Sequence, residues 1–282
     1  MVASRSSNFP YSPAPVAAII FLVTFTIATA WHIFIAVPKR TWYLAPLLCG
    51  GILEVAGYAS RTAATFNTDD KPPYIIQLVC ILIAPTLFAA SLYMLFSRLV
   101  LLLRAESLCL VRPAWVTKIF VGGDVVCFLV QLIGAATVSR SGNFELGKTV
   151  ILVGLMAQIA VFGFFIVVAV VFHRRLARKA SPPADSLEGR GWRRGWERVL
   201  LGIYSASALV VIRSLFRFIE FAGPRDGPLM THEVYLYVFD SLLMLGVLAV
   251  LAVFHPAEYV PNKGLVERLS SSEMMDLRPE DN

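Results

Sequence analysis

The chain has 282 residues, and its composition differs from that of a soluble domain of similar size. Hydrophobic residues make up 57% and charged residues 16%, against about 45–50% and 25% in ordinary globular domains. The mean hydropathy is +0.69 and the pI is about 9.3. Together with several long apolar runs, these values exclude a water-soluble enzyme, a secreted disulfide-bonded scaffold and a freely diffusing nucleic-acid-binding protein.

Seven apolar segments are long enough to cross a bilayer as helices, which takes about 20 residues each. The sequence therefore predicts an all-α integral membrane protein, a bundle of seven transmembrane helices within residues 15–256. Residues 1–14 precede this bundle and residues 257–282 form a tail. The connection at 174–198 contains Pro182-Pro183 and several glycines, so it is expected to be a solvated loop. The predicted spans are 15–37, 43–64, 74–97, 115–138, 149–172, 199–221 and 234–254.

Lysine and arginine are distributed unevenly between the two sides of the predicted spans. One side holds 17 of the 25 basic residues and the other side holds six, while Arg213 and Arg217 lie inside a span. Because basic loops stay in the cytoplasm, the N-terminus is expected outside and the tail inside. Ala28-Thr29-Ala30 resembles a signal-peptidase site, but cleavage there would place the 17 basic residues outside. The first span is therefore expected to be retained.

Polar residues inside the spans recur at intervals of three, four or seven residues, which places each set on one helix face. Ionisable residues in a bilayer are costly and usually face the bundle interior. We therefore expect a polar, hydrated cavity that begins near the middle of the membrane and opens outward, with one acid left to meet a cation or hold a proton. The alternative is that these residues only fix the helix register. The second span carries Glu54, Tyr58 and Arg61, the third Tyr74 and Gln77, the fourth Asp124 and Gln131, the sixth Arg213, Arg217 and Glu220, and the seventh Glu233, Tyr237 and Asp240.

Pro85 lies in the middle of the third span. A proline inside a helix kinks it and leaves a backbone carbonyl without its usual partner. The 174–198 segment is basic and contains tryptophans, so it is expected to contact anionic lipid headgroups. No phosphate-binding motif of the form G-x-x-x-x-G-K-[ST] is present, so ATP hydrolysis by this chain is not expected.

The chain contains the strings CGGILEVAGYASR (49–61), QLVCILIAPTLFAASLY (77–93), FVGGDVVCFLVQLIGA (120–135), GKTVILVGLMAQ (147–158), RSLFRFIE (213–220), EVYLYVFD (233–240) and His255-Pro256. These strings resemble those of the RTA-like family, the fungal lipid-translocating exporters named for resistance to amino-cholesterol. The resemblance runs from about Tyr11 to Pro256. It implies a fungal multi-pass protein, most often of the plasma membrane, with a role in efflux and stress resistance. The cargo types that it implies are sphingoid long-chain bases, amino-sterols and xenobiotics.

The favoured function is a translocator that passes the headgroup of an amphiphilic lipid along the polar stripes while the acyl chain stays in the membrane. Its partners are membrane lipids and an amphiphilic small molecule, not nucleic acid, and no cofactor, catalytic residue or metal-binding residue is expected. The substrate-binding or translocation residues are predicted to be Glu54, Tyr58, Arg61, Gln77, Asp124, Gln131, Arg213, Arg217, Glu220, Tyr237 and Asp240.

Two other functions fit part of the same pattern. A seven-helix receptor or sensor of amphiphiles would have this topology and would contact a cytoplasmic partner through the 174–198 loop. An intramembrane hydrolase of the ceramidase type would need His32, His173 and His255 as zinc ligands. Zinc requires ligands that converge on one point, and the seventh span lacks a His-x-x-x-His pair, so this alternative is the weakest.

Overall fold

The computed structural model describes residues 14–39, 41–66, 71–139, 144–179, 187–224, 227 and 232–254. All regular secondary structure in these residues is helical, which confirms the predicted all-α class. Most of the predicted N-terminal segment and the whole tail lie outside the described residues. The elements are α1 (Pro15–Ala36), η1 (Trp42–Leu44), α2 (Ala45–Phe66), α3 (Lys71–Leu102), η2 (Glu106–Leu108), α4 (Pro113–Ser139), α5 (Phe144–Lys179), α6 (Leu187–Ala222), α8 (Glu233–Leu236), η3 (Tyr237–Ser241) and α9 (Leu242–Val253).

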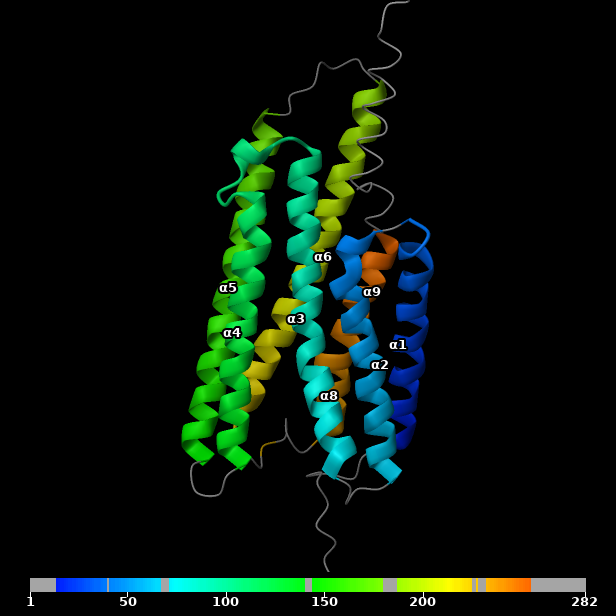
Figure 1. Ribbon diagram of the computed structural model, residues 1–282, viewed down its shortest axis with the longest axis vertical. Coiled ribbons are helices and arrows are strands. Elements are labelled where there is room, and N and C mark those ends of the chain that lie inside the picture. The colour runs from blue at the N-terminus through cyan, green and yellow to red at the C-terminus, as the bar shows by residue number, and fades with distance from the viewer. Residues whose placement is uncertain are drawn as a thin grey trace, which may run out of the picture.

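The helices lie side by side with their long axes roughly aligned (Figure 1). Helices α4 and α5 form one edge of the bundle, α1 forms the other, and α3 and α6 lie between them. The segments α8, η3 and α9 follow one another without a break. Together they form one continuous helical segment, Glu233–Val253, which we call the last rod of the bundle. Helix α2 packs between α1 and α3, so residues on its inner face can reach the last rod.

The outer surface of the bundle is apolar, while many polar side chains are buried inside it. Val16, Phe34, Ile133 and Val167 are all more than half exposed. A surface of this kind is unsuited to water and fits the hydrocarbon of a bilayer. Among the described residues, the helices long and apolar enough to cross a membrane are Pro15–Ala36, Lys71–Leu102, Pro113–Val138, Phe144–Arg178, Trp196–Ala222 and Glu233–Val253.

Helix α2 is not among these six candidates. It has 22 residues and so a length of roughly 33 Å, which is enough to cross the hydrocarbon core of a bilayer. Its mean hydropathy is lowered by Glu54, Arg61 and its several glycine, serine and threonine residues. Helix α2 can carry the two charged residues because they lie on its buried face, where Glu54 is 1% and Arg61 is 3% exposed.

The prediction of a loop over 174–198 was wrong at both ends. Helix α5 continues to Lys179 and α6 begins at Leu187, while Pro182-Pro183 lies outside the described residues. Arginine, leucine and glutamate favour helix, and between 187 and 198 they outweigh the three glycines. The two helices are also joined by a side chain, because the Tyr204 hydroxyl donates to the Ala169 carbonyl at 3.1 Å.

Helices α4 and α5 pack closely at Gly134. A Cβ atom there would lie 2.9 Å from the carbonyl oxygen of Gly147 and 2.9 Å from the backbone nitrogen of Ile151. We expect Gly134→Ala to destabilise the protein by on the order of 1–3 kcal/mol, as overpacking usually does. The measurement is the thermal midpoint of the detergent-solubilised protein. Gly122→Ala is the control, because a Cβ at Gly122 meets nothing within 4 Å; equal midpoints for the two variants would contradict close packing at Gly134.

Candidate functional site

The largest group of buried charges lies between α6 and the last rod of the bundle. Asp240, in η3, accepts contacts from two arginines of α6: Arg213 Nε lies 2.5 Å from Oδ1, and Arg217 Nη2 lies 3.0 Å from Oδ2. Arg217 also donates through Nη1 to Glu220 Oε2 at 3.0 Å. The spacing 213, 217 and 220 places the three α6 side chains on one face, as the stripe predicted. Asp240 is the only acid of this group that contacts both arginines.

Glu54 of α2 completes this group, which we call the charge cluster: Glu54, Arg213, Arg217, Glu220 and Asp240. Glu54 is 1% exposed, and neither of its carboxylate oxygens has a hydrogen-bond partner among the described residues. It lies within the electrostatic range of Asp240, Arg213 and Arg217. Three acids therefore face two arginines, so the cluster carries one negative charge in excess when all are ionised. Glu54 is the acid without a direct partner.

Helix α3 contributes a backbone group to the charge cluster. Pro85 has no N–H, so it cannot bond to the carbonyl of Ile81, four residues earlier. Arg213 Nη2 donates to this same carbonyl at 3.4 Å. The carbonyl that Pro85 was expected to leave free is therefore used to hold an arginine. We expect Pro85→Ala to restore the helical bond and to weaken this contact.

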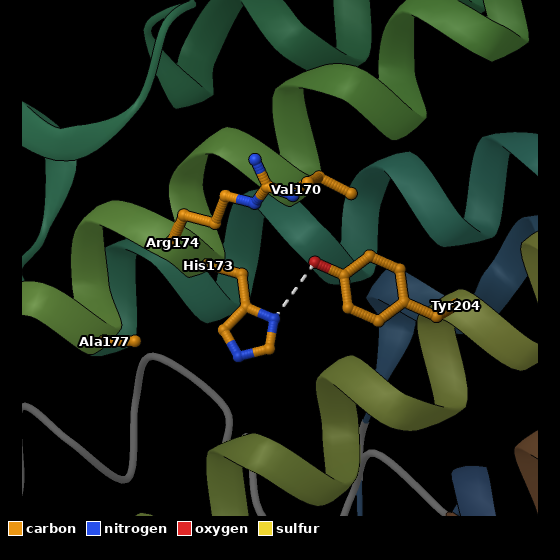
Figure 2. Close-up of a pocket in the computed structure, with 5 residues that line it drawn as sticks. All are labelled: Val170, His173, Arg174, Ala177 and Tyr204. Carbon is orange, nitrogen blue, oxygen red and sulfur yellow. Dashed lines mark hydrogen bonds between the residues drawn. The ribbon is translucent and has the colours of Figure 1, made fainter.

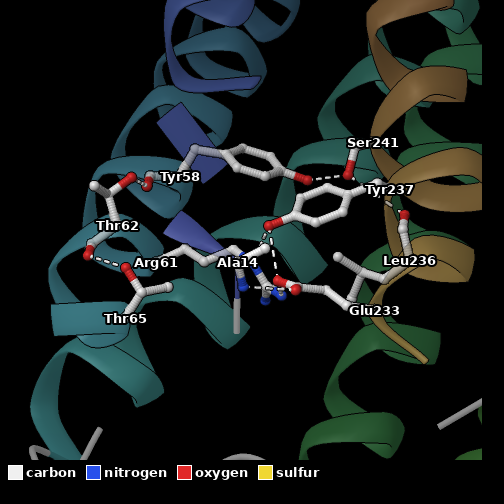
Figure 3. Close-up of polar contacts among 9 residues, drawn as sticks. All are labelled: Ala14, Tyr58, Arg61, Thr62, Thr65, Glu233, Leu236, Tyr237 and Ser241. Atoms are coloured by element: carbon white, nitrogen blue, oxygen red, sulfur yellow. Dashed lines mark hydrogen bonds and ion pairs between the residues drawn. The ribbon is translucent and has the colours of Figure 1, made fainter. Parts of the chain in front are cut away.

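A second polar group lies next to the charge cluster and uses the same segment of the last rod (Figure 3). Arg61 of α2 donates from Nη2 to Glu233 Oε1 at 2.7 Å and from Nε to the Tyr237 hydroxyl at 3.1 Å. The Tyr237 hydroxyl donates to Glu233 Oε1 at 2.9 Å, and the backbone N–H of Ala14 donates to Glu233 Oε2 at 2.8 Å. These contacts join the beginning of α1, the end of α2 and α8.

The segment η3 connects the two groups, because it is a short π-helix that contains Tyr237, Asp240 and Ser241. The Ser241 hydroxyl bonds to that of Tyr58 on α2, and the Tyr237 ring stacks on Phe21 of α1 at 5.1 Å. A single π-turn inside an α-helix is uncommon and often occurs at functional sites. Here it turns Asp240 toward α6 and Ser241 toward α2.

Gln131 of α4 reaches the charge cluster through a small cavity. Its amide donates to Gln158 Oε1 of α5 at 2.8 Å. Gln131, Gln158, Arg213 and Arg217 all line a cavity of about 50 Å³. A space of this size holds one or two water molecules, far less than a lipid headgroup. The sequence predicted a hydrated cavity that opens outward. Over the residues that the structure describes, no such opening reaches the charge cluster, because each of its acids and arginines is buried or nearly so.

Asp124 and Gln77 lie apart from these contacts. Asp124 accepts a hydrogen bond from the Tyr93 hydroxyl of α3 at 2.8 Å, in a group of aromatic rings that includes Phe120 and Phe165. Asp124 lies two helical turns from Gln131 on α4, roughly 10 Å along the axis. Gln77 is 2% exposed, and its side-chain oxygen has no hydrogen-bond partner among the described residues.

Sequence reasoning left four contacting residues out of the predicted site: Glu233, Ser241, Tyr93 and Gln158. Glu233 lies on the predicted stripe of the seventh span, four residues before Tyr237, and this spacing was the signal for including it. Gln158 closes one of the family-like strings, which was a weaker signal. Tyr93 closes another of these strings, so it had the same weak signal. Ser241 had none, because a serine in a helix is ordinary until its partner is known.

The described residues contain no group of three or more side chains suited to a metal ion. His32 donates from Nε2 to the carbonyl of Leu248 at 3.0 Å. His173 lies on α5 beside a pocket of about 350 Å³, where Nδ1 is 3.3 Å from the Tyr204 hydroxyl (Figure 2). The two imidazoles therefore have separate partners, and His255 lies outside the described residues.

Comparison with known proteins gives a consistent result. Protein RTM1 of Saccharomyces cerevisiae is 38% identical over 200 residues, covering 71% of this chain and 63% of that protein. Protoporphyrin uptake protein 1 of the same species is 36% identical over 74% of this chain and 67% of its own length. The sphingoid long-chain base transporter RSB1 of Saccharomyces cerevisiae is 24% identical over 84% of this chain and 70% of its own length.

The chain thus spans a little under two thirds of the first of these relatives. No solved structure matches. The family model described as RTA1 like protein matches residues 47–263, which include α2 from its third residue, all the later helices and every residue of the charge cluster. With its apolar helices, the chain is an integral, multi-pass membrane protein, and it belongs to the RTA1-like family.

Proposed function

We propose that this protein translocates amphiphilic lipids across the membrane, and that Glu54 receives the positively charged headgroup of the cargo. Sphingoid long-chain bases are the favoured cargo class, with amino-sterols and cationic xenobiotics as chemically similar alternatives. The names of two relatives, a sphingoid long-chain base transporter and a protoporphyrin uptake protein, support membrane transport of amphiphiles.

One observation carries the proposal: the buried carboxylate of Glu54 has no hydrogen-bond partner among the described residues, and it gives the charge cluster its one excess negative charge. A buried, unpaired charge is strongly unfavourable. Either a proton or a cation must therefore neutralise Glu54, and the ammonium group of a sphingoid base has the required charge. The other charges of the cluster already have partners within 3.0 Å.

Transport requires a second conformation, because Glu54 is buried in the described one. The contacts that would have to open lie between α2, α6 and η3. The π-turn supports η3 as the moving segment, since a change from π-helical to α-helical hydrogen bonding shifts the register by one residue and rotates the two parts of the last rod against each other. Such a rotation would move Asp240 and Ser241 together and expose Glu54 to one side of the membrane.

The proposed topology has seven spans, with α2 as the span that hydropathy alone misses. The spans occupy residues 15–256, with the N-terminal segment outside and the tail from residue 257 in the cytoplasm, and the favoured location is the plasma membrane. Support comes from the length of α2, its place in the bundle and the 17 basic residues assigned to one side.

Tags at the two ends of the chain test this topology. With seven spans, an N-terminal tag is expected outside intact cells and a C-terminal tag is expected to be protected until the membrane is permeabilised. The measurement is antibody binding before and after permeabilisation. If α2 did not cross the membrane, both tags would be found on the same side.

The transport function is tested with the purified full chain in liposomes. We expect a fluorescent sphingoid base to move between the leaflets faster than in empty liposomes of the same composition. Movement equal to that of empty liposomes, for sphingoid bases and other cationic amphiphiles alike, would overturn the proposal. That result would favour the receptor alternative, in which the cluster binds cargo without moving it.

A further inference from the structure

A large pocket with both polar and apolar lining residues lies at the end of the bundle where η1 and η2 are found, away from the charge cluster. Its volume is about 880 Å³, within the range of roughly 300–1,000 Å³ that is usual for small-molecule sites. It is formed by η1, the last turns of α3, η2 and the first turn of α4. Its lining residues come from two parts of the chain, Tyr43 and the stretch 94–117.

Two arginines line this pocket: Arg98 of α3, and Arg112, which is the residue before α4. The Arg98 guanidinium lies over the ring of Tyr43, 5.3 Å from its centre. In the part of the chain that the structure describes, neither arginine forms an ion pair with a carboxylate. Both guanidinium groups therefore remain available to an anion, and arginine is well suited to bind phosphate through two parallel hydrogen bonds.

Hydroxyl groups and one acid line the rest of the pocket. Ser97 and Thr117 lie 3.3 Å apart through their side-chain oxygens, and Ser107 and Glu106 come from η2. These groups can accept hydrogen bonds from the hydroxyls of a sugar or polyol. The Glu106 carboxylate would repel a ligand that itself carries a carboxylate beside its phosphate.

The residues in and around the pocket are of the types found where a protein meets the membrane surface. Met94 and Leu101 form an apolar wall, suited to the glycerol and first methylenes of a lipid. On the adjacent turn of α4, Lys118 lies over the exposed ring of Trp115 at 5.5 Å, and both residue types favour the interface. Basic pockets between helices on the cytoplasmic side are sites where anionic headgroups bind.

We propose that this pocket binds the headgroup of an anionic phospholipid with a hydroxyl-rich headgroup, of the phosphatidylinositol class. Arg98 and Arg112 bind the phosphate, and Glu106 with Ser97, Ser107 and Thr117 binds the headgroup hydroxyls. This site is independent of the proposed transport at Glu54 and requires only that this end of the bundle lies at the membrane surface.

The test measures binding of phosphatidylinositol, phosphatidylserine and phosphatidylcholine to the purified full chain by native mass spectrometry at equal lipid concentrations. Phosphatidylinositol is expected to bind most tightly. Arg98→Gln/Arg112→Gln is expected to weaken its binding by about tenfold or more, because bonds to charged groups contribute at least that much. Arg174→Gln/Arg178→Gln removes the same charge from exposed positions of α5 and is expected to leave binding unchanged.

Each of the other results would overturn the proposal in a defined way. Equal binding of phosphatidylserine and phosphatidylinositol would contradict the role of Glu106 and the hydroxyls. If inorganic phosphate displaced the lipid at equal concentration, the pocket would be a site for free phosphate. If replacing either arginine pair weakened phosphatidylinositol binding equally, binding would depend on the overall charge of the protein and not on this pocket. Arg112→Gln alone is the fallback variant, because Arg112 is exposed whereas Arg98 packs on Tyr43.

Discussion

Replacing Asp240 by asparagine is expected to lower the free energy of unfolding by about 3–5 kcal/mol, the usual result of breaking a buried ion pair by removing one partner. Asp240 is 1% exposed and contacts both Arg213 and Arg217. Its neutralisation leaves two buried guanidinium groups whose remaining partners among the described residues are Glu220 and the Ile81 carbonyl. The thermal midpoint of the purified protein in detergent, or its yield as a monodisperse species, measures this effect.

Two further variants distinguish the loss of the ion pair from a general disturbance of packing. Glu220→Gln is expected to cost less than Asp240→Asn, because Glu220 contacts Arg217 alone and is 8% exposed. The double change Asp240→Asn/Arg213→Gln should recover part of the stability, since it removes one of the unpaired charges. A single Asp240→Asn variant as stable as wild type would show that the charge cluster does not hold α6 against η3.

Replacing Glu54 by glutamine is expected to impair transport and to leave the fold intact, whereas Asp240→Asn is expected to destabilise the fold. Glutamine has nearly the same shape, and within the described part of the chain the carboxylate that it replaces has no hydrogen-bond partner to lose. Stability should stay equal or rise, because burying an unpaired charge is unfavourable. Movement of a sphingoid base in liposomes should fall by about tenfold or more, the equivalent of one charge-assisted contact.

Asp124→Asn is the matched control for Glu54→Gln. Asp124 is also a buried acid, and one of its oxygens likewise has no partner among the described residues. It lies in the aromatic group around Tyr93 rather than in the charge cluster. Transport by Asp124→Asn is therefore expected to stay near that of wild type. An equal loss in both variants would mean that any buried carboxylate matters, and Glu54 would have no special role.

Helix faces could be predicted from the sequence, but the pairing between helices could not. The spacing of 213, 217 and 220, or of 233, 237 and 240, fixes which residues share a face. It does not fix how far one helix is rotated or shifted against the next. For this reason the stripes of α2 and α6 were expected to line one cavity, whereas Arg61 pairs with Glu233 and the α6 arginines pair with Asp240. Asp124 turned toward Tyr93, although it is on the same α4 face as Gln131.

Local chemistry was more predictable than packing. The missing N–H of Pro85 predicted a carbonyl without its usual bond, and Arg213 donates to that carbonyl. The π-turn at Tyr237–Ser241 left no mark on the sequence, because it depends on how Asp240 and Ser241 meet α6 and α2. The glycines near the start of α6 were taken to end a helix, yet they lie inside one.

The most direct test of the role of Glu54 compares a fluorescent sphingoid base with its N-acetylated counterpart, which has no positive charge. Both are measured in liposomes that contain wild type or Glu54→Gln at equal protein density. Wild type is expected to move the charged amine faster than the acetylated compound, and Glu54→Gln is expected to lose this preference. If the preference were the same in both proteins, Glu54 would not be the group that receives the amine.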